Sequence, residues 1–317
     1  MGKCTISPAD IKRVKALGFL NNKGTDCFNG RVITVNGKIT ADQTIAIAQA
    51  ANKYGNGEVE FTTRLTVECR GIHYDNIDAF REAVQAVGLD TGGTGSLVRP
   101  VVSCKGTTCQ YGLLDTFALS EKIHEAFYLG YRTVKLPHKF KIAVGGCPNN
   151  CVKPDLNDLG VVGQLVPQYD EDLCNGCKKC QVTATCPIGA AQMVDGVCTI
   201  DTDKCNNCGR CVGKCPFDCI EEGKPGYRVY IGGRWGKQVA HGQLIQHIFT
   251  SEEEVMSFIE KAILLFREQG KTGERFATTI ERIGFENVQA QLLGDEILER
   301  KQAILDAPLH LVGGATC

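Results

Sequence analysis

The sequence predicts an α+β fold that is interrupted by a small cysteine-rich insert. The first observation is a strand, helix, strand, helix pattern across residues 27–90, followed by helical patterns over residues 252–266 and 277–293. The second is the distribution of the 18 cysteines, because ten of them lie within the 46 residues from Cys174 to Cys219. A chain of 317 residues is long enough for two or three domains.

The composition is that of a globular protein without a strong charge bias. Lys and Arg (35) nearly balance Asp and Glu (36), so neither nucleic acid nor a membrane surface is expected as a partner. The sequence has no signal-peptide core, and no run approaches the roughly 18 apolar residues of a membrane span. We therefore expect a cytoplasmic protein, in which reduced cysteines bind metal rather than form disulfides.

The first predicted strand and helix are joined by a turn. Residues 31–35 form a β-branched run that ends at the turn signal Asn36-Gly37. Thr40 and Gln43 have the spacing of a capping box, which predicts the start of an alanine-rich helix.

The second strand and helix follow directly. Residues 58–72 alternate between apolar and polar side chains, which predicts one strand with Arg64 on its polar face. A helix with apolar side chains at helical spacing is predicted from Asp75 to the stop signal at Gly88.

The remaining elements surround the insert. The glycine-rich residues 91–96 are typical of a linker, and an amphipathic helix is predicted at about 113–129. Two strands are predicted at 139–144 and 158–166, and a glycine-rich loop at 232–243.

The insert contains two cysteine runs that each end in Cys-Pro. The second run has the spacing of bacterial two-cluster ferredoxins, in which three cysteines bind one 4Fe-4S cluster and the fourth binds the other. Zinc is the alternative, but zinc sites usually contain close pairs rather than triplets. The predicted ligand sets are Cys174, Cys177, Cys180 and Cys215 for one cluster, and Cys205, Cys208, Cys211 and Cys186 for the other. Cys198 and Cys219 remain, and we expect them to be buried.

Two further cysteine pairs lie outside the insert. CKGTTC spans Cys104 to Cys109, and CPNNC spans Cys147 to Cys151, 38 positions after the first pair ends. Brought together in the fold, the four thiols could surround one more iron–sulfur cluster. The spacing alone leaves zinc open as an alternative.

The segment LPHKFKIAVGGCPNNC followed by NDLGVVG, with EFTTR and VRPVVSC upstream, resembles the siroheme-dependent sulfite and nitrite reductases. With its ferredoxin insert, the layout is most similar to the catalytic C subunits of anaerobic sulfite reductases. The resemblance implies a ferredoxin-like half domain at 1–95, a siroheme and 4Fe-4S domain at 96–168 and 223–317, and a 2×4Fe-4S ferredoxin insert at 169–222.

The resemblance also assigns roles to the two outer pairs and to four basic residues. Cys104, Cys109, Cys147 and Cys151 would bind a 4Fe-4S cluster, and Cys151 would also ligate the siroheme iron. The family commonly has five residues inside the first pair, whereas this chain has four, so a tighter loop is expected at Cys104. The implied cage for the substrate anion consists of Arg64, Arg99, Lys139 and Lys141.

Lys139 and Lys141 lie two residues apart, so on a strand their side chains would share one face. The siroheme carboxylates need cationic donors, and the candidates are Arg31, Arg70, Arg234 and Lys237. His124, His138 and His241 are candidate proton donors or iron ligands, but we expect each to be a satisfied structural histidine. Trp235 is expected to be a packing residue rather than a redox relay.

The resemblance implies siroheme-dependent six-electron reduction of sulfite to sulfide by an anaerobic-type enzyme. It implies three 4Fe-4S clusters and electrons supplied by donor subunits or ferredoxin. The family core has two homologous halves and this chain has one, so a homodimer or larger even assembly is expected. The alternatives are a nitrite reductase that forms ammonia and an electron-transfer subunit without siroheme.

Overall fold

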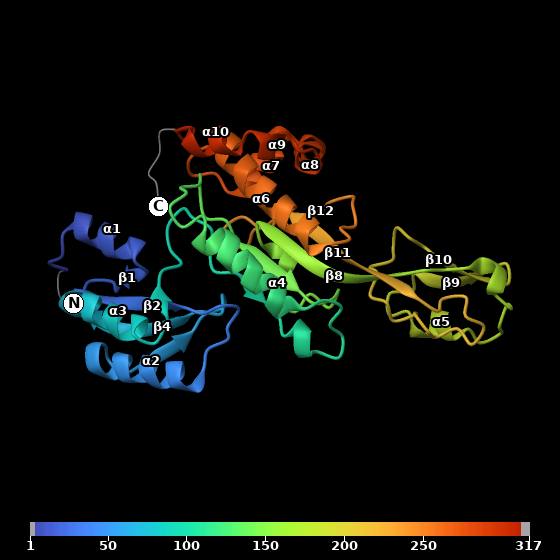
Figure 1. The fold of residues 1–317 in the computed structure, drawn as a ribbon, viewed down its shortest axis with the longest axis horizontal. Coiled ribbons are helices and arrows are strands. Elements are labelled where there is room, and N and C mark those ends of the chain that lie inside the picture. Colours follow the sequence, from blue (N-terminus) through green and yellow to red (C-terminus); the bar gives the residue numbers. More distant parts are fainter. Residues whose placement is uncertain (1–3, 312–317) are drawn as a thin grey trace.

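The computed structural model describes residues 4–311, which form two β-sheets with flanking helices and a projecting lobe (Figure 1). The N-terminal sheet is antiparallel, with strand order β1-β2-β4-β3 and with β5 also paired to β2. Its strands are β1 (Phe19–Asn21), β2 (Cys27–Ile33), β3 (Val59–Phe61), β4 (Val67–His73) and β5 (Asp90–Thr91).

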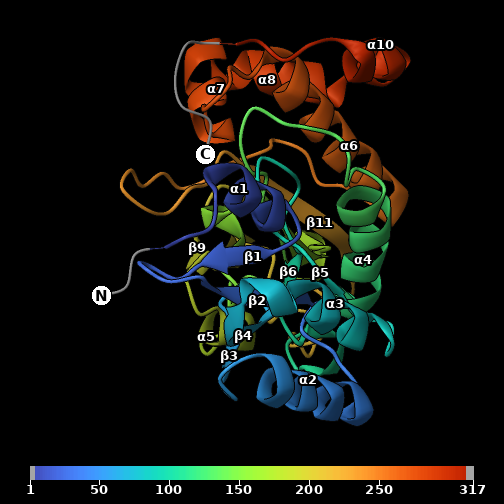
Figure 2. The ribbon, with the colours of Figure 1, turned by 90° about the vertical axis from the view of Figure 1, so that its left-hand side faces the viewer.

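Three helices pack against this sheet: α1 (Pro8–Ala16), α2 (Ala41–Tyr54) and α3 (Ile77–Gln85). The predicted capping box is confirmed, since Thr40 Oγ1 accepts from Gln43 N at 3.1 Å and Gln43 Oε1 accepts from Thr40 N at 3.0 Å. Helices α2 and α3 lie side by side against the sheet (Figure 2), and Val14 of α1 belongs to the same buried core. Phe28, Ile47 and Phe80 are fully or almost fully buried between these layers.

The prediction of a single strand over residues 58–72 is wrong. The segment is a hairpin in which β3 pairs antiparallel with β4. Its turn is closed by a hydrogen bond from Thr62 N to Thr66 O, and Leu65 adopts a left-handed φ of 57°. Because both arms of a hairpin keep the period of two, alternation alone did not reveal the turn. Arg64 therefore lies at a hairpin tip and not on the face of a strand.

The second sheet has the order β12-β11-β8-β7-β6. β6, β7 and β8 are parallel, whereas β11 pairs antiparallel with β8 and β12. The strands are β6 (Val102–Ser103), β7 (Ile142–Gly145), β8 (Leu159–Pro167), β11 (Gly223–Ile231) and β12 (Gln243–Leu244). The predicted strand at 158–166 is thus confirmed, while β7 begins three residues later than predicted. The backbone N–H of Lys141 bonds to the Asp158 carboxylate at 2.9 Å instead of to a neighbouring strand.

Helices cover the second sheet and build the larger core. The helix predicted at 113–129 begins at Thr116, after the N-cap Asp115, and continues into π-helical geometry over His124–Leu129. The helix predicted at 277–293 is broken at Gly284, where φ is 93°. The C-terminal helices are α6 (Glu252–Gln269), α7 (Phe276–Ile283), α8 (Phe285–Leu293), α9 (Glu296–Glu299) and α10 (Lys301–Asp306).

The cysteine-rich insert forms the projecting lobe at the end of the β8–β11 ribbon (Figure 1). It contains α5 (Gln181–Thr185) and an antiparallel hairpin of β9 (Ala191–Val194) and β10 (Val197–Ile200). The lobe has a small apolar core of its own that includes Val182 and Ile220. Over residues 4–311, no helix combines the length and the apolar character that a membrane span requires.

Candidate functional site

The two outer cysteine pairs converge because they follow neighbouring parallel strands. Cys104 follows β6 and Cys147 follows β7, and the two strands are in register at Ser103 and Val144. Cys104 Sγ accepts a hydrogen bond from Gly146 N at 3.1 Å. Burial raises the pKa of the Cys147 thiol, and the nearby thiols of Cys104, Cys109 and Cys151 act in the same direction. Cys147 is therefore close enough to each of the other three thiols for their charges to act on it.

Two glycines allow the loops of these pairs to touch. A Cβ atom on Gly146 would lie 2.8 Å from the Cα of Gly106, and one on Gly106 would lie 2.9 Å from the Cα of Gly146. Real Cβ atoms do not approach backbone so closely. The four-residue spacing between Cys104 and Cys109 is accommodated by a short 3-10 turn, Gly106–Thr108.

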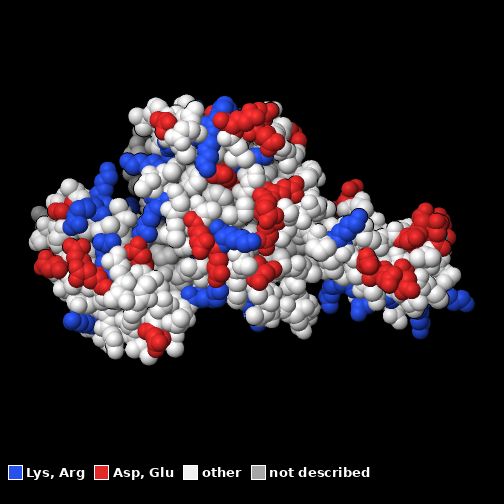
Figure 3. All heavy atoms as spheres, viewed as in Figure 1, with Lys and Arg blue, Asp and Glu red and all other residues white. Residues whose placement is uncertain are grey.

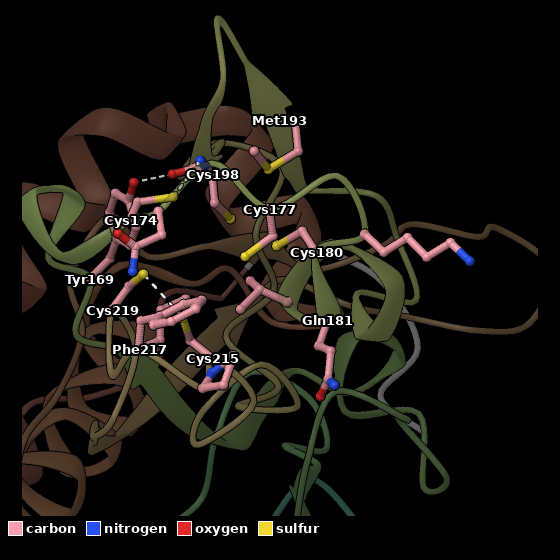
Figure 4. A pocket seen from close by; sticks show the side chains of 15 residues that line it. Tyr169, Cys174, Cys177, Cys180, Gln181, Met193, Cys198, Cys215, Phe217 and Cys219 are labelled. Atoms are coloured by element: carbon pink, nitrogen blue, oxygen red, sulfur yellow. Dashed lines mark hydrogen bonds between the residues drawn. The ribbon is translucent and has the colours of Figure 1, made fainter.

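Within the lobe, the first predicted ligand set lines one cavity, here called the outer cavity. Its walls include Cys174, Cys177, Cys180 and Cys215, and Figure 4 shows these cysteines around a common space. The two remaining cysteines, Cys198 and Cys219, are buried as predicted, and they line the same cavity. Cys219 Sγ lies 3.2 Å from Cys215 Sγ.

The second predicted set lines a separate space, here called the inner cavity. Cys186, Cys205, Cys208 and Cys211 all contribute to its wall. In the part of the chain that the structure describes, no three His, Cys, Asp or Glu side chains are arranged to bind a single metal ion. Each of the two sets predicted for the lobe instead lines a cavity.

The basic residues implied for the anion are largely buried and close to one another. Arg64 donates to Asn157 Oδ1 at 3.0 Å and to the carbonyls of Pro100 and Ile142. Arg99 donates to the Gly93 carbonyl, and its Nε atom is buried without a hydrogen-bond partner. Burial, together with the charges of neighbouring arginines, lowers the pKa of Arg64 and of Arg99 to about 10.

Lys141 completes this group from the segment before β7. Burial lowers its pKa to about 8, and the charges of Arg64, Arg275 and Lys139 act in the same direction. Burial and neighbouring cations lower the pKa of His138 to about 4. His138 Nδ1 accepts from the backbone N–H of Lys139 at 2.8 Å, so the structural role expected for this histidine is consistent with its contacts.

Sequence reasoning missed two residues at the centre of this group. Asp158 is fully buried, and both its oxygens accept from Arg275 Nη2 at 2.9 Å. The same carboxylate accepts from Lys141 N at 2.9 Å, so it positions the lysine backbone. Asp158 belongs to the segment NDLGVVG, and a charged residue at the start of a buried strand was the available signal. Nothing in the local pattern around Arg275 singles it out.

A wide cavity of about 900 Å³ opens beside the basic group. Lys139, Arg234, Lys237 and Arg275 line it, so two of the four predicted carboxylate-binding candidates lie there. Arg234 donates to Thr278 Oγ1 at 2.6 Å, and its Nε atom is buried without a partner. Trp235 also lines the cavity and is 64% exposed, so the packing role predicted for it is wrong. Trp235 lies in a loop between two glycines, so its indole ring does not pack into a buried core.

The other two carboxylate-binding candidates differ from each other. Arg31 bonds to Glu68 and donates to the Gly93 carbonyl at 2.9 Å, the acceptor that Arg99 also uses, so it joins the basic group. Arg70 instead forms exposed ion pairs with Glu58 and Glu60. The structure does not bring Arg70 to the basic group.

Two histidines considered as proton donors or iron ligands lie elsewhere. His241 is exposed, and its Nδ1 atom is 2.8 Å from Asp155 Oδ2. His124 is buried in the π-helical segment and stacks on Tyr128 with a ring distance of 4.8 Å. Its Nδ1 atom has no partner, so it is not the satisfied structural histidine expected from the sequence.

Acidic and basic side chains alternate on the molecular face in Figure 3, in keeping with the net charge of −1. The basic group is therefore distinguished by its burial rather than by a general positive charge on the protein. A half-exposed cation is screened by water, whereas a buried one binds an anion more strongly.

Two family descriptions match this chain. Residues 21–87 match the nitrite/sulfite reductase ferredoxin-like half domain, and residues 94–301 match the nitrite and sulphite reductase 4Fe-4S domain. The second description names a 4Fe-4S cluster, and the residues that it matches include both outer cysteine pairs and the lobe.

Several curated proteins are similar in sequence. The coenzyme F420-dependent sulfite reductase of Methanocaldococcus jannaschii is 32% identical over 75% of this chain and 38% of its own length. The C subunit of the anaerobic sulfite reductase of Salmonella typhimurium is 29% identical over 47% of both chains. The match therefore spans less than half of either relative.

A solved structure has the same fold at low sequence identity. The crystal structure of dissimilatory sulfite reductase I superposes with a TM-score of 0.67 over 84% of this chain and 69% of the other, at 22% identity. With two adjoining domain matches, the larger of which spans most of the chain, this protein belongs to the nitrite and sulphite reductase family.

Proposed function

We propose that this protein reduces sulfite to sulfide at a siroheme, with electrons that pass through its cysteine-rich lobe. The buried group of Arg64, Arg99, Lys141 and Arg275 is the observation that carries this proposal. The fully buried Asp158 pairs with Arg275, and its charge also acts on Arg64, Arg99 and Lys141. Four cations beside one carboxylate leave excess positive charge in this partly buried site. Such a site favours a small anion. The relatives named as sulfite reductases support sulfite as that anion.

The residues around the wide cavity fit siroheme. Siroheme carries carboxylate arms, and the cavity is lined by Arg234, Lys237 and Arg275. The buried Nε atoms of Arg99, Arg234 and Arg275 lack acceptors, so donors for carboxylate oxygens are already present. When bound, siroheme supplies the iron at which sulfite is reduced. Cys151 would ligate that iron and would share the adjoining 4Fe-4S cluster with Cys104, Cys109 and Cys147.

Asn157 connects the proposed cluster loop to the basic group. Its Oδ1 accepts from Arg64, and its Nδ2 donates to the carbonyl of Lys153, two residues after Cys151. Arg64 and Arg99 would bind and orient the anion, and Lys139 would extend the cage on the cavity side. Lys141, with its pKa of about 8, is mostly protonated at neutral pH and can donate protons as oxygen leaves as water.

The lobe would act as a two-cluster ferredoxin domain that delivers electrons. The thiols of Cys174, Cys177, Cys180 and Cys215 would bind one 4Fe-4S cluster in the outer cavity. Those of Cys186, Cys205, Cys208 and Cys211 would bind a second in the inner cavity. Donor subunits or a reduced ferredoxin would supply the electrons. We place the protein in the cytoplasm, where its thiols stay reduced.

The test is an anaerobic assay of the purified protein with reduced methyl viologen. We expect a higher kcat/KM for the formation of sulfide from sulfite than for the formation of ammonia from nitrite. The reason is that the relatives named as sulfite reductases match 75% and 47% of this chain, whereas one named as a nitrite reductase matches 40%. A preference for nitrite would favour nitrite reductase, the second function within the family. Visible spectra that lack tetrapyrrole bands would instead indicate an electron-transfer subunit.

We also propose that the protein forms a homodimer or a larger even assembly. The chain has one half domain and one 4Fe-4S domain, whereas a two-fold arrangement would supply the second half of the family core. Size-exclusion chromatography with light scattering should give at least twice the 34.4 kDa of one chain. A monomer at assay concentration contradicts this expectation.

A further inference from the structure

The inner and outer cavities differ in what surrounds them. The second cysteine run of the lobe, which lines the inner cavity, contacts the second sheet. There, Leu165 N on β8 donates to the Asn207 carbonyl at 2.9 Å. Arg228, on β11, donates from Nη2 to the carbonyl of Cys205 at 2.9 Å. The inner cavity thus lies where the lobe joins the second sheet, next to the half-buried Arg228.

The second cysteine run of the lobe, Cys205 to Cys215, also lies near the two cysteine pairs outside the lobe. The guanidinium carbon of Arg210 lies 5.8 Å from the ring centre of Tyr111, which follows Cys109 by two residues. The inner cavity is therefore the one on the side of the proposed siroheme site. An electron that enters the lobe at its free end must visit the outer cavity first.

The outer cavity lacks a comparable fixed cation among the residues that the structure describes. Asp218 N donates to the Cys215 carbonyl at 3.3 Å, which holds an acidic residue close to an outer cysteine. Lys179 lines the outer cavity but is exposed, so solvent screens its charge. Asp218 is exposed as well, so solvent screens both charges at the outer cavity, whereas Arg228 beside the inner cavity is half-buried.

Reduction adds one negative charge to an iron–sulfur cluster, and a nearby cation stabilises that charge. Net charge, hydrogen bonding and solvent exposure set the potentials of such clusters. Arg228 acts across the partly dehydrated junction between lobe and sheet, where its field is less screened than at the surface. An inner cluster beside Arg228 is therefore easier to reduce than it would be without the arginine.

We propose that Arg228 is a positioning residue that raises the reduction potential of the inner cluster and so directs electrons inward. In this step the outer cluster loses one electron and the inner cluster gains it. The inference rests on the proposed two-cluster role of the lobe. It adds which cluster is proximal and which residue sets the direction of transfer.

The test is an anaerobic redox titration of the full chain, followed by electron paramagnetic resonance. Signals are assigned with Cys177→Ser for the outer cluster and Cys208→Ser for the inner cluster. Arg228→Gln retains a donor for the Cys205 carbonyl but removes the charge. We expect its inner-cluster potential to fall by about 59 mV, a tenfold loss in the equilibrium constant for inward transfer. The outer potential should not change.

Two further variants separate charge from structure. Arg228→Lys keeps the charge and should restore most of the wild-type potential. Arg210→Gln removes an exposed cation that lines the inner cavity and should shift the potential less than Arg228→Gln. An unchanged inner potential in Arg228→Gln, or an equal shift in Arg210→Gln, overturns the proposal.

If Arg228→Gln does not retain the inner cluster, the lysine variant decides. An inner-cluster potential near the wild-type value in Arg228→Lys supports the charge effect. A potential lower by about 59 mV or more, which is a tenfold change in the equilibrium constant, contradicts it. Failure of the proposed function is distinguishable, because a chain without siroheme would lack sulfite reduction and tetrapyrrole bands while both lobe potentials could still be measured.

Discussion

Single residues in the basic group derive their chemistry from burial. Lys141 has an ordinary side chain, but burial and the charges of Arg64 and Arg275 lower its pKa to about 8. A lysine with this pKa holds its proton at neutral pH and gives it up more readily than an exposed lysine. Asp158 is the buried counter-charge of this group, since it is fully buried and pairs with Arg275.

Lys141→Ala should slow sulfide formation roughly 10²-fold while the siroheme spectrum stays largely intact. Lysine is charged below its pKa, so wild-type activity should decline as the pH rises through about 8. Steady-state sulfide assays between pH 6 and 10 measure both effects. Lys141→Arg keeps its charge at high pH, so its decline should move to higher pH. Loss of the spectrum in Lys141→Ala would refute the assigned role.

Asp158→Asn should lower the free energy of unfolding by about 3–5 kcal/mol, because it leaves Arg275 buried without its ionic partner. Anaerobic urea denaturation measures the change. Arg70→Gln removes an exposed ion pair and should cost at most about 1 kcal/mol. Similar losses of unfolding free energy in Asp158→Asn and Arg70→Gln would contradict a larger contribution from the buried pair.

At the scale of elements, parallel strands decide where the cysteines meet. β6 and β7 end side by side, so pairs separated by 38 positions reach the same edge of the sheet. Contact between the two loops then depends on the absence of side chains at Gly106 and Gly146.

Gly146→Ala should push these loops apart, because its Cβ would lie 2.8 Å from the Gly106 Cα. We expect loss of the cluster between the outer pairs, measured as a fall of about one third in iron and acid-labile sulfide. Thr108→Ala, an exposed change in the same loop, should retain full iron. Full iron in the Gly146 variant would contradict the predicted ligand arrangement.

At the scale of the whole molecule, the lobe is attached through a single ribbon. β8 ends at Pro167 and β11 begins at Gly223, and these two residues are paired across the ribbon. A two-residue turn is sufficient to close a hairpin at such a pair. The lobe also has its own apolar core.

Replacing residues 168–222 by Asn-Gly should therefore leave the main body folded. Iron per chain should fall by about two thirds, and tetrapyrrole absorbance should remain. Circular dichroism and iron analysis measure these outcomes on the same sample. If the tetrapyrrole bands disappear although the protein stays folded, the lobe contributes to siroheme binding as well as to electron delivery.

The sequence by itself determined the family, the grouping of the cysteines and most helices and strands. Cysteine spacing, capping residues and apolar periodicity are local properties, so they can be recognised without knowledge of distant contacts. The capping box at Thr40 is one example, since both of its hydrogen bonds join residues three apart.

Only the tertiary structure decided how the charges are arranged. Arg275 meets Asp158 across 117 positions of sequence, and Arg64 reaches Asn157 from a hairpin tip that alternation did not reveal. The placement of the inner cysteine run beside Arg228 is decided in the same way. Burial and proximity set pKa values and ion pairing, and both arise when distant segments pack, so no local pattern encodes them.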